Sequence, residues 1–294
     1  MLQNNPVLAQ IRTTLTRRVL GELERKADAE PEAYATFWGN FGAVLKEGLY
    51  EDASQRETLL KLARFRTTVA DGWVTLAEYA GRMRPGQEAI YYIAGDEGAA
   101  LNQSPQLEGF KARGIEVLLL ADPVDEFWIP AVGSFGEKPL RSVTRGTDEL
   151  AKIDPIETDP ASDEPAADLG GLIALFKLTL KDWVKDVRSS NRLTDSPVCL
   201  VADAGDLDLH LERLLKQHRQ TDRISKRILE LNPRHALIRG LVARLGDAGA
   251  HDTVVDMAHV LLDQARIVEG EPLPDPAAFT RRLAGLLQKG VAAS

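Results

Sequence analysis

The 294-residue sequence has a single cysteine and no long apolar run, and each shortage excludes a class of protein. One cysteine cannot close a disulfide within the chain. No run reaches the roughly 18 apolar residues that span a membrane, and the N-terminus lacks the pattern of a signal peptide. The chain is 44% hydrophobic, which is enough to build cores, and its length favours two domains. We therefore expect a soluble cytoplasmic protein with no membrane partner.

Positive charge is also scarce, with 36 Lys and Arg against 44 Asp and Glu and a net charge of -8. A net negative chain does not attract the phosphate backbone of nucleic acid, and we exclude nucleic acid as a partner. Residues 153–168 hold six of the acidic residues and three prolines, with no Lys or Arg. Such a segment cannot bury enough apolar surface to offset its ordering entropy. We predict an exposed, mobile linker over 151–168 between domains at 1–150 and 169–294.

Catalytic and metal-binding motifs are missing as well. The sequence has no phosphate-binding glycine loop, nucleophile elbow, zinc-protease helix or paired-cysteine motif. Residues 133–136 miss the elbow spacing by one position and predict a turn. His259 and Asp263 have the spacing of helical metal ligands, but two ligands do not make a site, so we predict no metal. Cys199 lies in an apolar run without cationic neighbours, which predicts a small buried hydrophobe.

Apolar periodicity predicts helices over most of the first 66 residues. One helical face carries Leu8, Ile11, Leu15, Val19 and Leu23, and another carries Tyr34, Phe37, Trp38, Phe41 and Leu45. Pro31 fits the first turn of the second helix. Thr75 and Glu78 have the spacing of a capping box ahead of a further helix. Pro123 is expected to begin a short helix that Pro130 ends.

Two apolar strands are predicted at 89–94 and 115–120, with a short helical stretch at 105–113 between them. Strand, helix and strand in this order indicate a parallel pair. Acidic residues lie near the carboxyl ends of these strands, namely Asp96, Asp122 and Asp125. Because α/β sheets often place chemistry at such ends, a small-molecule hydrolase or transferase is the alternative function.

After the linker the pattern predicts an α+β domain ending in two amphipathic helices at 252–268 and 276–288. Earlier elements are expected as helices at 169–181, 206–217 and 235–245 and strands at 184–189, 198–202 and 227–231. The last two helices have clear apolar stripes, formed by Val254, Met257, Ala258, Leu261, Leu262 and Ala265 and by Phe279, Leu283, Leu286 and Leu287. Paired with a second copy they would form a four-helix interface, and packing within one subunit is the rival.

Two stretches carry more apolar material than one core requires. Phe127, Trp128 and Ile129 follow one another in a short helix, where successive side chains point about 100° apart. They cannot all face the same core. The second stretch is a stripe formed by Leu207, Leu211, Leu214 and Leu215. Core packing would account for either stretch, whereas a large open apolar patch would mark a partner-binding surface.

Five stretches, in this order and spacing, resemble the ninety-kilodalton heat-shock chaperone family. They are TFWGNFGAVLKE at 36–47, LAEYAGRMRPGQEAIYYIAG at 76–95, GIEVLLLADPVDE at 114–126, KDVRSSNRLTDSPVCLVA at 185–202 and LELNP at 229–233. By this resemblance to the bacterial branch, 1–150 is the second part of a middle domain, with a helical subdomain at 1–68 and an α/β sheet subdomain at 75–150. Residues 169–294 are then a C-terminal dimerisation domain, and the chain is a fragment of fold class α/β (α+β).

The resemblance implies a chaperone that binds unfolded or partly folded client proteins, forms a homodimer and works with a co-chaperone. It assigns client contacts to Glu126, Phe127 and Trp128 and to the stripe of Leu207, Leu211, Leu214 and Leu215. It assigns dimerisation to the last two helices. Residues 1–3 resemble the tail of a family motif whose arginine assists ATP hydrolysis. We therefore expect ATP and Mg²⁺ to be cofactors of the full-length parent, and this fragment to have no cofactor and no enzyme activity.

Overall fold

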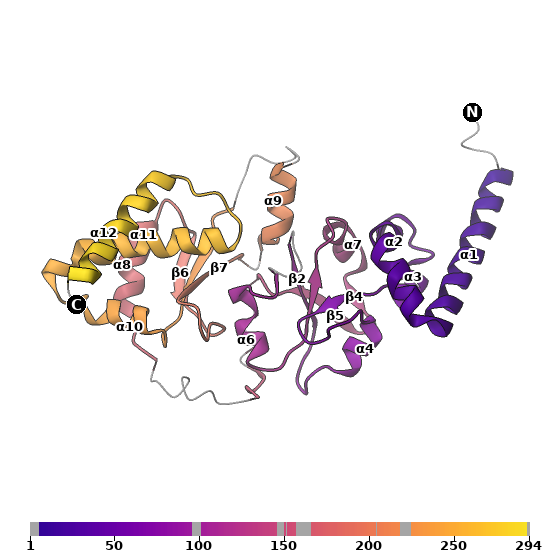
Figure 1. Ribbon diagram of the computed structural model, residues 1–294, viewed down its shortest axis with the longest axis horizontal. Helices are drawn as coiled ribbons and strands as arrows, with labels where there is room; N and C mark the ends of the chain where they lie inside the picture. The colour runs from indigo at the N-terminus through magenta and orange to yellow at the C-terminus, as the bar shows by residue number, and fades with distance from the viewer. Residues whose placement is uncertain are drawn as a thin grey trace. The chain divides into compact units, whose positions relative to one another are not determined.

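A computed structural model describes most of the chain in two compact units (Figure 1). The described residues are 6–95, 101–145, 150, 152–156, 166–203, 205–217 and 225–292. The first unit comprises Met1–Met83, Glu88–Gly98 and Glu116–Arg141, and the second comprises Arg84–Gln87, Ala99–Ile115 and Ser142–Ser294. Within these described ranges, no helix is long and apolar enough to cross a bilayer. The linker predicted at 151–168 stays a prediction, because most of it lies outside them.

The first unit starts with helices α1 (Pro6–Ala29), α2 (Pro31–Glu51), α3 (Arg56–Leu62) and α4 (Leu76–Gly81). The start of α4 has the predicted capping box. The Thr75 hydroxyl accepts from the Glu78 backbone N–H at 3.1 Å, and the Glu78 carboxylate accepts from the Thr75 N–H at 2.7 Å. Each group satisfies a donor that the helix leaves open at its start.

The two long helices use their predicted apolar faces differently. On α2, Tyr34 and Trp38 are buried in the core, while Phe41 is 54% exposed. On α1 the predicted face is largely uncovered, with four side chains between 46% and 57% exposed: Leu8, Ile11, Leu15 and Val19. The helix packs instead through Leu20 and Leu23. Apolar spacing therefore located the helix, but not the side that is covered.

Within the described residues, the first unit has a mixed five-stranded sheet in the order β1-β3-β2-β5-β4. Its strands are β1 (Arg66–Thr67), β2 (Ile90–Ala94), β3 (Val117–Leu120), β4 (Ser134–Phe135) and β5 (Lys138–Ser142). The predicted parallel pair is confirmed, because Tyr91 lies opposite Val117 and Ala94 lies opposite Leu120. Strand β1 pairs antiparallel with β3, so the sheet is not parallel throughout. Every residue of β2 is buried, which explains its continuous apolar run.

Two local predictions in this unit are wrong. The predicted turn at 133–136 contains strand β4, which pairs antiparallel with β5, and the turn itself is formed by Gly136, with φ 58°, and Glu137. Pro130 lies inside helix α7 (Asp125–Val132) instead of ending it, and the helix ends at Gly133, with φ 72°. A proline near the last turn removes one hydrogen bond of a helix that is about to stop.

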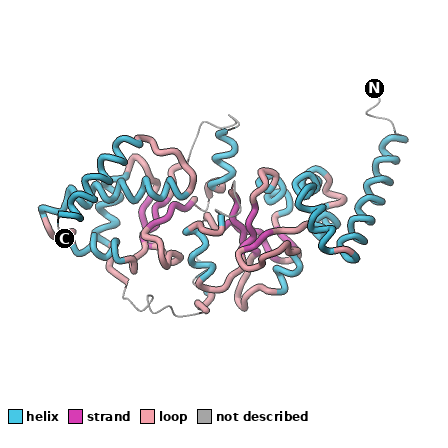
Figure 2. The backbone as a smooth tube through the Cα atoms, in the orientation of Figure 1, coloured by secondary structure: helices cyan, strands magenta, loops and turns pink. Residues whose placement is uncertain are grey.

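The second unit has helices on a small sheet. Its elements are the 3-10 helix η2 (Pro105–Leu107), α6 (Glu108–Lys111), α8 (Gly170–Leu180), β6 (Asp186–Ser189), β7 (Val198–Val201), α9 (Leu209–Gln217), β8 (Ile228–Leu231), α10 (Ala236–Ala243), the 3-10 helix η5 (Ala248–Ala250), α11 (His251–Val268) and α12 (Pro276–Ala292). Strand β8 is central, parallel to β6 and antiparallel to β7. Helices α8 and α11 pack beside these strands (Figure 2).

A buried arginine joins the early and late segments of the second unit. Arg192 is 1% exposed, and its guanidinium donates to the Val143 carbonyl at 2.6 Å and to Gln106 Oε1 at 3.2 Å. Nearby, the Glu108 carboxylate accepts from the backbone N–H groups of 194–196. Residues before and after the predicted linker therefore share one folded unit.

Candidate functional site

Helix α7 presents one of its three predicted contact residues to solvent. Trp128 is fully buried and Glu126 is 4% exposed, whereas Phe127 is 48% exposed. The Trp128 indole N–H donates to Asp125 Oδ1 at 2.6 Å, which ties the ring inward. Trp128 and Glu126 are therefore buried, and of the three residues only Phe127 is exposed to solvent.

The inner side of α7 rests on a buried ion pair. Lys46 of α2 is 5% exposed, and its Nζ lies 2.8 Å from an oxygen of Asp122 and 2.8 Å from Asp125 Oδ1. Burial raises the pKa of the Asp125 carboxyl, while Lys46 and the Trp128 hydrogen bond act in the opposite direction. Of the three aspartates considered for a hydrolase or transferase site, Asp122 and Asp125 are thus engaged by Lys46, and Asp96 lies outside the described residues.

Phe127 has an aromatic neighbour that the sequence analysis missed. The Tyr50 ring lies 6.0 Å from the Phe127 ring between centroids, and Tyr50 is itself 38% exposed. Tyr50 follows Lys46 by four positions on α2, so the two side chains lie on one helical face. That spacing from a buried lysine was the available signal. We call Tyr50 and Phe127 the aromatic pair.

Helix α9 and the segment just before it divide the predicted leucine stripe into two sides. Leu214 is 9% exposed, while Leu207 is 43% exposed and both Leu211 and Leu215 are half-buried. Leu211 and Leu215 are four residues apart on α9 and share one side of the helix, and Leu207 lies two residues before its start. We call Leu207, Leu211 and Leu215 the leucine stripe. Leu214 belongs to the inner side of the helix.

Charged side chains fix the position of α9. Asp208, 2% exposed, accepts hydrogen bonds from the hydroxyls of Thr144, at 2.8 Å, and Ser142. One turn later, the buried Glu212 forms an ion pair with Arg227. The leucine stripe is therefore carried by a helix that is attached at its start and along its inner side.

The residue after α11 adds an ionisable group beneath α9. Arg213 of α9 donates to the backbone carbonyl of Glu269 at 2.6 Å, and Gln106 donates to the Glu269 side chain at 3.1 Å. Burial of the carboxyl group raises the pKa of Glu269 to about 7, although other atoms of the residue reach solvent.

Helix α11 buries most of its predicted stripe within the single chain. Five of the six residues assigned to the dimer interface are at most 4% exposed in the single chain: Val254, Ala258, Leu261, Leu262 and Ala265. They pack in the core of the second unit with Phe176 and Leu200, and Met257 is partly buried against the same core. In the single chain this stripe covers the sheet, and its assignment to a dimer interface stays a prediction.

Helix α12 keeps apolar side chains near solvent. It packs along α11 (Figure 1), with an ion pair between Arg282 and Asp256 at 3.7 Å. Phe279, Leu283 and Leu286 are half-buried, Leu287 is 62% exposed and Val291 is 79% exposed. The face available for self-association is therefore on α12, and Val291 extends the predicted stripe by one turn.

Nucleophilic and metal-binding groups play no evident part in these surfaces. Cys199 is 2% exposed, and burial raises the pKa of its thiol, so the predicted inert hydrophobe is confirmed. Across the part of the chain that the structure describes, no group of three His, Cys, Asp or Glu side chains is placed to hold a metal ion.

Comparisons with known proteins identify the family. The family model described as Hsp90 protein matches residues 1–294. Similar curated proteins named Chaperone protein HtpG include those of Paramagnetospirillum magneticum, 52% identical over 99% of this chain and 47% of the relative, and Roseobacter denitrificans, 52% identical over 99% of this chain and 48% of the relative. The chain spans about half the length of these relatives. It belongs to the Hsp90 family.

Proposed function

We propose that residues 1–294 hold client proteins and self-associate as part of an Hsp90-type chaperone. The observation that supports this most is that each unit keeps apolar side chains outward on a helix whose inner side is fixed by buried charged groups. Side chains held in this way can cover exposed apolar surface on an unfolded or partly folded protein, at about 25 cal/mol per Å² buried.

The aromatic pair and the leucine stripe are the proposed client contacts. Neither surface needs a pocket of defined shape, because burial of apolar area is not directional. Each contact is weak, and a dimer would present every surface twice, so that avidity adds to the affinity for an extended client. Weak repeated contacts also allow release of the client.

The finer organisation belongs to the same proposal. We assign 1–150 to the second part of a middle domain and 169–294 to the C-terminal dimerisation domain. ATP and Mg²⁺ binding, and any co-chaperone contact that depends on nucleotide, are assigned to a domain outside this chain. Residues 1–294 alone are expected to release no phosphate from ATP in a colorimetric assay, and steady release would refute that assignment.

Suppression of aggregation tests the client surfaces. Light scattering of a heat-aggregating protein should fall when the chain is added. Two double variants, Leu207→Asp with Leu211→Asp and Tyr50→Asp with Phe127→Asp, should each lose about half or more of that suppression, because a carboxylate at the contact opposes apolar burial. Leu178→Asp is the matched control, since Leu178 is 69% exposed on α8 and outside both surfaces. Equal suppression by all variants would refute both assignments.

Sedimentation tests the self-association. The unaltered chain should sediment with the mass of two copies, and Leu287→Asp with Val291→Asp should sediment as one, because the charges replace the most exposed apolar residues of α12. Val69→Asp, at a site 64% exposed in the first unit, should leave the dimer intact. A monomeric parent chain, or a dimer that survives both α12 substitutions, would show that α12 is not the interface.

A further inference from the structure

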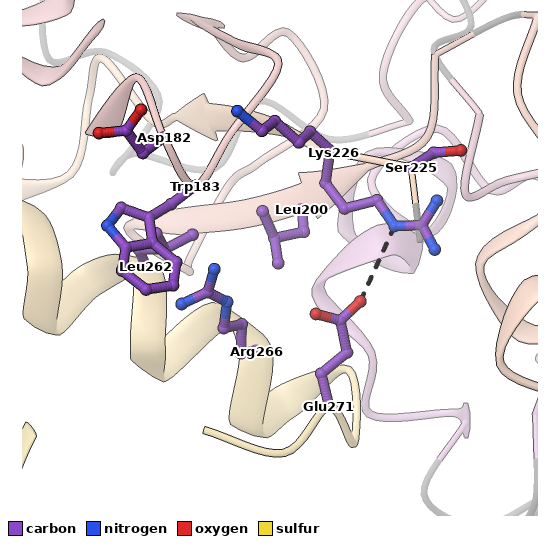
Figure 3. A pocket seen from close by; sticks show the side chains of 9 residues that line it. Asp182, Trp183, Leu200, Ser225, Lys226, Leu262, Arg266 and Glu271 are labelled. Carbon is purple, nitrogen blue, oxygen red and sulfur yellow. Dashed lines mark ion pairs between the residues drawn. The ribbon is translucent and has the colours of Figure 1, made fainter. Parts of the chain in front are cut away.

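A cavity of about 170 Å³ lies in the second unit, and its lining includes none of the residues proposed to contact clients or to self-associate (Figure 3). Its apolar wall is formed by Trp183 after α8, Leu200 of β7 and Leu262 of α11. An engineered cavity of about 150 Å³ in another protein accommodates benzene. The space here is therefore large enough for one aromatic ring with a small substituent.

Arg227 supplies buried donors at this cavity. Its side chain is 7% exposed and pairs with Glu212 through Nη2, but Nε and Nη1 donate to no acceptor among the described residues. The Glu271 carboxylate lies 3.8 Å from Nε, which is too far for a hydrogen bond. Buried guanidinium groups normally find acceptors for their N–H groups, so these two point to an acceptor that the described residues do not supply.

A second guanidinium faces the same space. Arg266 extends from α11 between Trp183 and Glu271 in Figure 3. It lies 5.3 Å from the centre of the Trp183 ring, and one of its donors contacts Asp263 at 3.0 Å. Five N–H donors in a planar fork leave capacity for a further carboxylate. The lining thus combines apolar and aromatic side chains with two guanidinium groups, beside the carboxylates of Asp182 and Glu271.

We propose that this cavity binds a small aromatic carboxylate. The ring lies against Trp183, Leu200 and Leu262, and the carboxylate lies between Arg227 and Arg266. Glu271 occupies the anionic position when the ligand is absent. Its side chain is 28% exposed on the turn after α11, so it can swing outward and yield its place. The ligand carboxylate then lies within hydrogen-bond distance of Arg227. The Glu271 carboxylate, at 3.8 Å from Nε, does not.

Calorimetric titration of the whole chain tests the ligand class, with benzoate as the probe. Benzoate should bind saturably. Inorganic phosphate, which lacks the aromatic ring, and benzyl alcohol, which lacks the carboxylate, should each bind at least about tenfold more weakly. Phosphate binding as tight as that of benzoate would overturn the aromatic assignment. Benzyl alcohol binding equally well would overturn the carboxylate assignment, and no benzoate binding would overturn both.

Substitutions with opposite expected effects test the position. Arg266→Gln should weaken benzoate binding about tenfold, because it removes a charge-assisted contact. Glu271→Gln should strengthen binding, because the competing carboxylate is gone. Arg234→Gln, at an exposed arginine that does not line the cavity, should change nothing. Equal affinities in the first two variants would overturn the proposal.

A crystallographic experiment on the unaltered chain does not depend on the folding of any variant. Crystals soaked in 3-bromobenzoate should show the anomalous bromine signal beside Trp183 and Leu262. A signal confined to other places in the chain, or no signal at a concentration that saturates the calorimetric titration, would overturn the assignment of this cavity.

Discussion

In the first unit, Phe127 projects from a helix whose inner side rests on a buried lysine–aspartate pair. In the second unit, the leucine stripe projects from a helix held by hydroxyl groups at its start and by Glu212 along its inner side. Both surfaces are apolar and outward, yet the first anchor is a lysine–aspartate ion pair, whereas the second begins with hydroxyl groups that donate to the Asp208 carboxylate. An exposed apolar side chain can therefore project from a helix that is firmly held. Substitutions in the anchors should lower the free energy of unfolding more than substitutions in the surfaces they support.

The largest expected effect is at the first anchor. Lys46→Met should lower the free energy of unfolding by about 3–5 kcal/mol, because it leaves the buried Asp125 carboxylate without its partner. Chemical denaturation followed by tryptophan fluorescence measures this. Adding Asp125→Asn should recover part of the loss, since the unpaired charge is then absent. A loss below about 1 kcal/mol in Lys46→Met would show that the pair is solvated and would remove the contrast between the anchors.

A smaller effect is expected at the second anchor. Asp208→Asn should cost about 1–3 kcal/mol, because the replacement amide accepts the Ser142 and Thr144 hydroxyls less well than a carboxylate does. Hydrogen exchange measured by mass spectrometry should show faster exchange in α9, with α7 unchanged. Uniform acceleration in both helices would mean that the two anchors are one cooperative structure and would contradict the comparison.

A third effect concerns pH and applies to the second unit only. Because burial raises the pKa of Glu269 from 4.5 to about 7, the folded chain holds this proton more tightly than the unfolded chain does. The resulting stabilisation is complete below about pH 4.5 and is lost as the pH rises through about 7. In the Glu269→Gln variant, the thermal midpoint should therefore vary less with pH across this window. At pH 8 it should be higher than in the unaltered chain. An unchanged pH profile would exclude Glu269 as the titrating group.

The sequence predicted most elements of the fold because their signals are local. Thr75 and Glu78 satisfy donors within one helical turn, and β2 needs no partner residue to be recognised as a buried apolar run. The β4–β5 hairpin was missed because Ser134 and Phe135 form a strand of only two residues. Two residues are too few to show the alternation of apolar and polar side chains that predicts a strand. Its pairing depends on Lys138 and Pro139 across the Gly136 turn.

The candidate surfaces were only partly predictable, because spacing reveals a stripe but not the direction it faces. Trp128 and Leu214 carry the same apolar signal as Phe127 and Leu207 and are nevertheless buried. On α11 the entire stripe covers the sheet, whereas a similar stripe on α12 reaches solvent. Direction is decided by tertiary contacts such as the Lys46 pair, which joins residues 79 positions apart. The aromatic partner Tyr50 is recognisable only once that contact is known.

The Arg192 contacts also bear on how this chain can be divided. A recombinant C-terminal piece that begins after the acidic linker would omit Gln106 and Val143, and with them the acceptors that satisfy a guanidinium buried to 1% exposure. It would also leave the backbone donors of 194–196 without the Glu108 carboxylate. The predicted linker at 151–168 is thus a poor place to divide the chain, because residues before it supply hydrogen-bond acceptors to the second unit.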